Sequence, residues 1–179
     1  MVAGVCRLRQ ISHVSWLFAA TLACATVWLG CGQDRAGPDG LHGAVQRGDA
    51  ERVRAILDAG TEVDLRDPAG WTALHRAAGS GEAEVVALLL ERGAEASLTT
   101  DEGVMSVDVA AAGGHIEVVV MLLGEPPRGF SKSVGGWTPL HGAARGGHAS
   151  LIEALLARGA SVSETTDRGF TPLYLAALA

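Results

Sequence analysis

The sequence predicts an all-α fold in which short helical repeats stack into a solenoid. Glycine recurs at positions 70, 103, 136 and 169, and each glycine begins a variant of one six-residue segment: GWTALH, GVMSVD, GWTPLH and GFTPLY. A fixed period of this length, here 33 residues, is typical of stacked repeat proteins. Aromatic residues make up only 4% of the 179 residues, and the many small residues suit helices that pack closely.

Each repeat is expected to contain two helices, a turn between them and a projecting finger. In the repeat that begins at Gly70, Thr72 can cap a helix over 74–80, which Gly81 ends. A second helix over 84–92 follows with its valine and leucine side chains packing inward, and Gly93 stands where a left-handed residue commonly ends a helix. One such unit cannot bury its own apolar face, so neighbouring units must stack.

In this pattern, residues 37–179 resemble ankyrin repeats. The resemblance is carried best by 70–102, GWTALHRAAGSGEAEVVALLLERGAEASLTTDE, and by 136–168, GWTPLHGAARGGHASLIEALLARGASVSETTDR. It implies an ankyrin-repeat solenoid whose unit is a helix-turn-helix with a β-hairpin finger. The expected division is 1–31 as signal peptide or membrane anchor, 32–36 as tether, 37–69, 70–102, 103–135 and 136–168 as repeats, and 169–179 as a partial repeat.

The third repeat departs from the pattern in two places. Ser106-Val107-Asp108 replaces Pro-Leu-His at the start of its first helix, and Gly124-Glu125-Pro126-Pro127 replaces the end of its second. Two consecutive prolines must end that helix early. The segment is either sequence drift in a tolerant region or a contact loop that carries Arg128, Phe130 and Lys132.

The last repeat stops after one helix, which carries Leu173, Leu175 and Leu178 and has no polar cap. Since an uncapped apolar face favours association, we expect either that the sequence is a fragment or that the last helix is covered.

The first 31 residues have the composition of an export signal. Arg7 and Arg9 precede an uncharged, mostly apolar run over 14–30, as in secretory signals. Trp28-Leu29-Gly30-Cys31 resembles the lipobox of bacterial lipoproteins, which implies lipidation of Cys31 and a cell-envelope protein anchored to a membrane, facing the periplasm or the exterior. Two alternatives stay open: cleavage at Ala23-Cys24-Ala25 would release a soluble protein, and an uncleaved helix would anchor the chain in the inner membrane.

Charge and histidine spacing argue against several other classes of function. The 12 basic and 20 acidic residues after Cys31 give a formal charge of −8, whereas nucleic-acid binding requires clustered basic residues. His42, His75 and His141 share one column, but helices about 8–10 Å apart cannot bring them to one metal at about 2.1 Å. We expect these imidazoles to hydrogen-bond the backbone of adjacent turns. With no phosphate loop or nucleophile motif, the sequence predicts no enzyme, cofactor, metal site or small-molecule substrate.

The predicted binding surface lies along the bases of the fingers. The residue after each opening glycine is large and apolar in every repeat from the second onward: Trp71, Val104, Trp137 and Phe170. Aromatic and arginine side chains dominate interface hot spots, so we include Arg76 and Arg145 on the first helices. The finger tips are expected to add charge through Asp67, Asp101, Glu102, Asp167 and Arg168. The result would be an acidic, tryptophan-lined groove; alternatively, the two tryptophans only cover the neighbouring finger.

The predicted function is therefore an exported, lipid-anchored module that binds a protein partner. Two alternatives are a membrane-tethered adaptor with an uncleaved N-terminal helix, and a regulatory or inhibitory subunit that masks an enzyme or a toxin.

Overall fold

The computed structural model describes residues 40–124 and 132–178, and the regular structure in these residues is helical. The helices come in pairs separated by short turns, and the predicted all-α class is confirmed. Their bounds are α2 Leu41–Gln46, α3 Ala50–Asp58, α4 Ala73–Ser80, α5 Ala83–Glu91, α6 Ser106–Gly113, α7 Ile116–Leu123, the 3₁₀ turn η1 Val134–Gly136, α8 Pro139–Arg145, α9 Ala149–Ala157 and α10 Pro172–Ala176.

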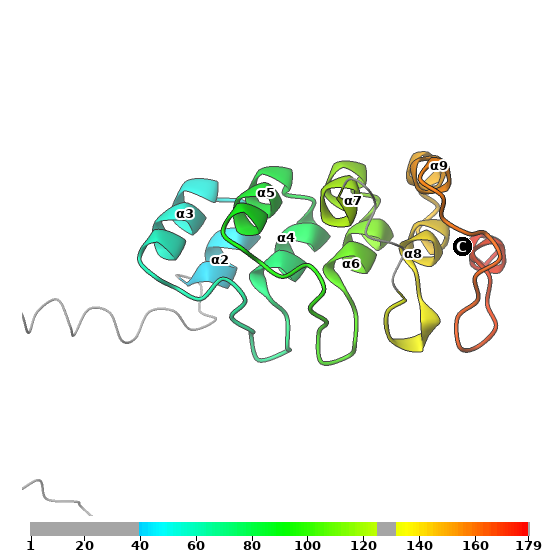
Figure 1. Ribbon diagram of the computed structural model, residues 1–179, viewed down its shortest axis with the longest axis horizontal. Helices are drawn as coiled ribbons and strands as arrows, with labels where there is room; N and C mark the ends of the chain where they lie inside the picture. The colour runs from blue at the N-terminus through cyan, green and yellow to red at the C-terminus, as the bar shows by residue number, and fades with distance from the viewer. Residues whose placement is uncertain (1–39, 125–131, 179) are drawn as a thin grey trace, which may run out of the picture. The chain divides into compact units, whose positions relative to one another are not determined.

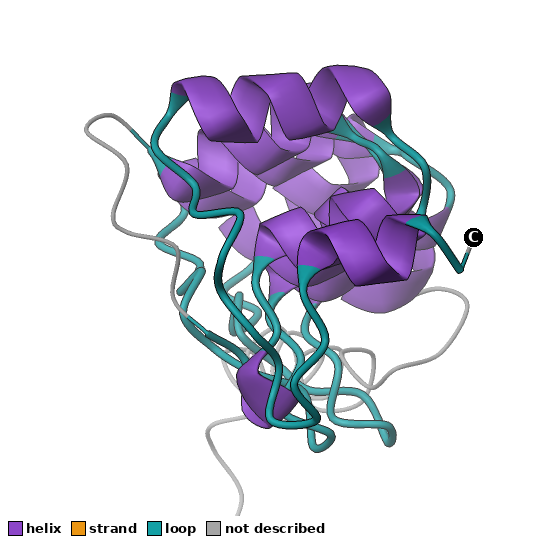
Figure 2. Cartoon of the chain, turned by 90° about the vertical axis from the view of Figure 1, so that its right-hand side faces the viewer, coloured by secondary structure: helices purple, strands orange, loops and turns teal. Residues whose placement is uncertain are grey.

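The helices form two rows, with the fingers on one side of them (Figure 1). We call α2, α4, α6, α8 and α10 the inner helices, because their row lies beside the fingers, and α3, α5, α7 and α9 the outer helices. Each inner helix packs against the next inner helix, and each outer helix against the next outer helix. Viewed along the rows, the fingers project together beyond the inner helices (Figure 2). Each repeat therefore contacts its neighbours in sequence, as expected for a stacked array.

The helix boundaries follow local signals in the sequence. Thr72 precedes α4, and its amide donates to Nδ1 of His75, 3.3 Å away, in a capping arrangement. Gly81 ends α4 with φ of +74°, a conformation that favours glycine. Gly93 also has a positive φ, of +85°, after α5. The predicted helix over 74–80 and the two glycine positions are confirmed.

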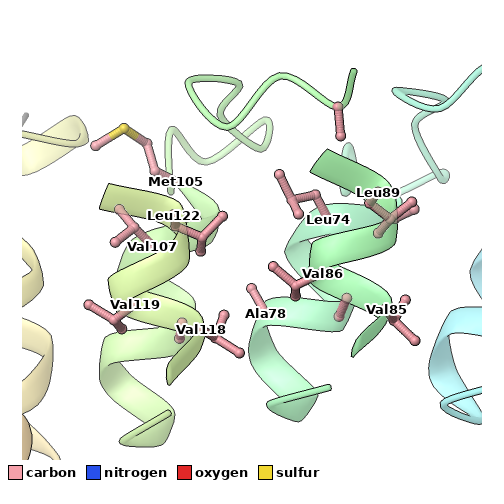
Figure 3. Close-up of a cluster of buried hydrophobic side chains, with 14 of the residues drawn as sticks. Leu74, Ala78, Val85, Val86, Leu89, Met105, Val107, Val118, Val119 and Leu122 are labelled. Carbon is pink, nitrogen blue, oxygen red and sulfur yellow. The ribbon is translucent and has the colours of Figure 1, made fainter. Parts of the chain in front are cut away.

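The core lies between the two rows of helices. Leu74 of α4 and Val85, Val86 and Leu89 of α5 are almost completely buried. Figure 3 shows them with the corresponding apolar side chains of α6 and α7, which include Val118, Val119 and Leu122. Burial of one such side chain contributes about 1.5–3 kcal/mol to folding. Because the core is continuous from one repeat to the next, each repeat depends on its neighbours for part of this burial.

The fingers contain less β structure than the predicted hairpins. Among the described residues they contribute only isolated antiparallel bridges, Arg66 with Thr72 and Thr99 with Met105. Each finger is closed instead by two backbone hydrogen bonds. The amide of residue 67, 100, 133 or 166 donates to the carbonyl four residues later at 2.8–3.0 Å, and the carbonyl of the same residue accepts from the amide three residues later at 2.8–3.1 Å. The fingers are therefore tight turns held at their bases.

The third repeat keeps the register of the array but has a shorter outer helix. α7 has eight residues, whereas α3, α5 and α9 each have nine. It ends before Gly124, which confirms the prediction of an early end. Arg128 and Phe130 lie outside the described residues, while Lys132 forms an ion pair of 2.5 Å with Glu164 of the next finger.

The sequence predicts an uncapped apolar helix at one end of the chain and an export signal at the other, and the described residues test only the first of these. On α10, Leu173 is 79% exposed, whereas Leu175 is buried. The segment 1–31, with Cys31, and the tether at 32–36 lie outside the described residues. Within 40–124 and 132–178, no helix has both the length and the apolar composition needed to cross a membrane.

Candidate binding surface

The four residues at the finger bases, Trp71, Val104, Trp137 and Phe170, are each partly exposed. The glycine before each has a positive φ, between +73° and +78°. A side chain in place of Gly70 would also collide with the carboxylate of Asp101 on the next finger. Glycine therefore lets the chain turn sharply while consecutive fingers approach closely, and this turn brings the four residues into one row.

Histidines connect the inner helices to this row. Nε2 of His42, His75 and His141 lies 3.1 Å from the carbonyl oxygen of Trp71, Val104 and Phe170, respectively. A carbonyl only accepts, so Nε2 carries the proton and donates. In His75, Nδ1 then accepts from the amide of Thr72, which makes this imidazole neutral.

The prediction that the histidines bridge to adjacent turns is confirmed. Burial lowers the pKa of His75 and His141, so both stay neutral near pH 7. A second column contributes the same kind of contact, because Nε2 of His115 and His148 lies 3.1 and 2.9 Å from the carbonyls of Gly79 and Ala112 in the preceding repeat.

Trp71 forms part of a charged cluster with Arg76 and Asp67. The guanidinium of Arg76 lies 5.7 Å from the centroid of the Trp71 ring, and its Nε donates to Asp67 Oδ2 at 3.0 Å. Asp67 is buried and also accepts from the amides of Ala69 and Trp71. Burial alone would raise the pKa of Asp67, but the hydrogen bonds from Arg76 and the two amides outweigh it and lower the pKa. The prediction that Asp67 lies at an exposed finger tip is therefore wrong: it positions Arg76 over the tryptophan.

Trp137 has a similar arrangement two repeats later. Arg145, at the end of α8, lies 5.9 Å from its ring centroid, and the His141 ring meets it edge-on at 6.0 Å. Arg145 is exposed, and α8 has Gly142 where α4 has Arg76. Phe170 differs from both tryptophans, because its ring stacks on Tyr174 at 4.9 Å.

Trp137 lines two cavities. The first, of about 360 Å³, is lined by the bases of two fingers and by α6 and α8: Val104, Asp108, Val109, Ala112, Ser133, Val134, Trp137, Thr138, Gly142 and Arg145. The second, of about 470 Å³, is lined by Gly135, Trp137, Thr166, Asp167, Arg168 and Phe170. The structure thus brings Val104, Trp137 and Arg145 together in the first cavity, and Trp137 and Phe170 in the second. Trp71 and Arg76 line neither of these two cavities.

The first cavity contains a buried carboxylate that the sequence analysis did not assign to the site. Asp108 is only 9% exposed, and its Oδ1 has no hydrogen-bond partner. Burial raises the pKa of Asp108 to about 6, although the Ser133 hydroxyl and the Met105 amide partly oppose the rise. The signal for this residue was its place in the histidine column, where an acid replaces an imidazole.

Within the described ranges, no group of three or more His, Cys, Asp or Glu side chains is arranged to hold a metal ion.

Comparison with known proteins is consistent with this geometry. The family model for ankyrin repeats (3 copies) matches the chain over residues 16–100, 41–133 and 107–179. No curated protein sequence matches the chain at a significant level.

Proposed function

The chain belongs to the ankyrin-repeat family, whose repeats indicate a protein–protein interaction module, and on this premise we propose that its partner binds along the finger bases. The contact would run across Trp71, Val104 and Trp137, with Arg76 and Arg145 beside the two rings. The partner is a protein, and the module itself performs no chemistry.

One observation carries this proposal: both tryptophans remain partly exposed although each has an arginine over its ring. A tryptophan that only covered its neighbouring finger would leave little surface for a partner. Tryptophan and arginine are enriched among residues that dominate binding energy, because they bury a large area and keep polar groups for hydrogen bonding. Neighbouring fingers are also linked, since the amide of Val134 donates to the carbonyl of Gly103, so the surface is preorganised.

Export and lipid anchoring are part of the same proposal and rest on the sequence. The basic residues, the apolar run and the Gly30-Cys31 step support a signal that ends at residue 31, with a lipid on Cys31. All three cysteines lie at or before that position, so the repeats can fold in an oxidising compartment without mispaired thiols.

Affinity capture from an envelope extract tests the binding surface. The baits would be the full chain, the double variant Trp71→Ala/Trp137→Ala, and the control Ile116→Ala/Leu156→Ala, which removes exposed apolar side chains from the outer helices α7 and α9. We expect a protein retained by the full chain and the control and lost from the tryptophan variant, with all three equally helical by circular dichroism. Equal capture by all three would place the contact elsewhere and overturn the proposal. A single tight partner whose activity stops on binding would favour the inhibitory-subunit alternative.

Intact mass and membrane fractionation test the anchor. Cys31→Ala should abolish lipid incorporation and leave the protein as an unprocessed precursor. An unmodified full-length N-terminus in the wild-type protein would instead establish the uncleaved-anchor alternative.

A further inference from the structure

The contact between the third and fourth repeats lacks a hydrogen bond that the other described repeat contacts have. The carbonyls of Trp71, Val104 and Phe170 each accept twice, from an amide of their own finger and from a histidine Nε2 of the preceding repeat. Among the described residues, the carbonyl of Trp137 accepts only from the amide of Ser133, at 2.9 Å. The residue in the place of the histidine is Asp108, and an ionised carboxylate cannot donate. We call this contact the Asp108 junction.

Asp108 itself is poorly satisfied. Its Oδ2 accepts from the amide of Met105 at 3.4 Å, a weak hydrogen bond, and its Oδ1 has no hydrogen-bond partner. The nearby Ser133 hydroxyl lowers the pKa of this carboxyl but does not offset the effect of burial. A buried carboxylate in this state is costly, because it has lost water without gaining full compensation. Relative to its neighbours, the junction has lost one donor and gained an unsatisfied acceptor.

Asp108 and Trp137 both line the 360 Å³ cavity. Its walls are apolar where Val104, Val109, Ala112 and Val134 contribute side chains, and the Trp137 ring forms a further side. This combination favours a flexible alkyl chain with a donor-rich, positively charged end. The formal charge of −8 after Cys31 also favours a cationic ligand, as does the Asp108 carboxylate, which has no ion-pair partner among the described residues.

We propose that this cavity takes up a lysine side chain of a protein partner, with its ammonium group bound at the Asp108 junction. The ammonium would donate to Asp108 Oδ1 and to the carbonyl of Trp137, and so would replace the missing histidine, while its methylene groups pack on the apolar walls. The proposal rests on the proposed function, because it assumes a protein partner, and it names the feature of that partner which the surface recognises.

A lysine fits better than an arginine. An arginine commonly binds a carboxylate through both oxygens, and here Oδ2 is already engaged by the Met105 amide. An ammonium is compact and has three donors, which matches two separate acceptors. Arg145 carries the same charge as the incoming lysine, but it is exposed at the rim, where water screens it.

Nuclear magnetic resonance of the full chain in mild detergent tests the proposal without any partner. The probe is Nα-acetyl-lysine methylamide, and the matched control is Nα-acetyl-norleucine methylamide, which lacks the ammonium. At constant ionic strength, we expect the lysine probe to shift the indole N–H signal of Trp137 but not that of Trp71, with at least about tenfold weaker binding of the norleucine probe. Equal binding of the two probes, or tighter binding of an arginine probe, would overturn the assignment to lysine.

Two substitutions test whether Asp108 binds the lysine probe. Asp108→Asn removes the charge and should weaken the lysine probe at least about tenfold. Asp108→His restores the residue found in the second and fourth repeats, so it should abolish binding of the probe and raise the melting temperature. Retention of the probe by a folded Asp108→His protein would exclude this site. Capture of the partner is measured separately, with the tryptophan variant. If the lysine probe does not bind, the proposed function is therefore unaffected. If no partner is captured, the result with the probe is likewise unaffected.

Discussion

The second and third repeats have the same backbone plan but hold the next repeat in different ways. α4 spans Ala73–Ser80, and α6 spans Ser106–Gly113, which is the same range 33 residues later. In the second repeat, a buried imidazole donates across the contact, whereas the third repeat presents a buried carboxylate that cannot. Helix position is therefore set by packing and by helix ends, while the polar bridge can vary without a change of register.

The largest difference should appear when each of these residues is truncated. His75→Ala removes the donor to Val104 and the acceptor for the Thr72 amide in a buried site, so we expect a loss of about 2–4 kcal/mol in the free energy of unfolding. Asp108→Ala removes an unsatisfied buried charge and should be neutral or stabilising at pH 7.5. Urea unfolding followed by circular dichroism measures both. Equal losses in the two variants would mean that the carboxylate is as well bonded as the imidazole.

The pH dependence of unfolding sharpens the comparison. The folded-state pKa of Asp108, about 6, lies above its ordinary value of 3.8, so the folded protein binds this proton more tightly than the unfolded chain. Its contribution to stability is fully present below about pH 4 and is lost as the pH rises through 6. Wild-type protein should therefore be less stable than Asp108→Asn at pH 7.5, by roughly 3 kcal/mol at most, and the gap should close by pH 4.

Wild type and Asp108→Asn are compared at each pH, so the contributions of groups that titrate in both proteins cancel. His75 and His141, whose pKa values are lowered, make the folded state less stable as the pH falls, but they do so equally in wild type and variant. Asp67, with its lowered pKa, acts in the same direction. If the difference in the free energy of unfolding between wild type and Asp108→Asn stays constant between pH 7.5 and 4, Asp108 is not the titrating group.

The smallest effect is expected for the ion pair between Lys132 and Glu164. Both side chains are more than 40% exposed, so water and salt screen their attraction. Lys132→Met should change the free energy of unfolding by less than about 0.5 kcal/mol, and Glu164→Gln by a similar amount. Measurement in low and high salt checks this; a loss above about 1 kcal/mol that persists in high salt would mean that the pair fixes the finger before α8.

The sequence predicted the features that repeat and depend on local geometry. Helices, the glycines that end them and the imidazole bridges all follow from a residue type at a fixed position in a 33-residue unit. It did not predict the burial of Asp67 or the cavity beside Asp108, because both depend on how two repeats meet. In the sequence, Asp67 has the features of an ordinary turn residue. Its role depends on Arg76, nine positions later, whose guanidinium donates to its carboxylate. The cavity is lined by residues of two neighbouring inner helices, among them Asp108 of α6 and Gly142 of α8, so it exists only where the two repeats meet.

A stack in which each repeat contacts mainly its neighbours also has a mechanical property. A pulling force applied to the two ends of the array would pass through every contact between repeats in series. The contacts made by His42, His75 and His141 each carry a buried hydrogen bond that resists separation, whereas the Asp108 junction has none from that position. Under tension the array should therefore open first between α6 and α8, and a lysine bound there would raise the force at which it yields.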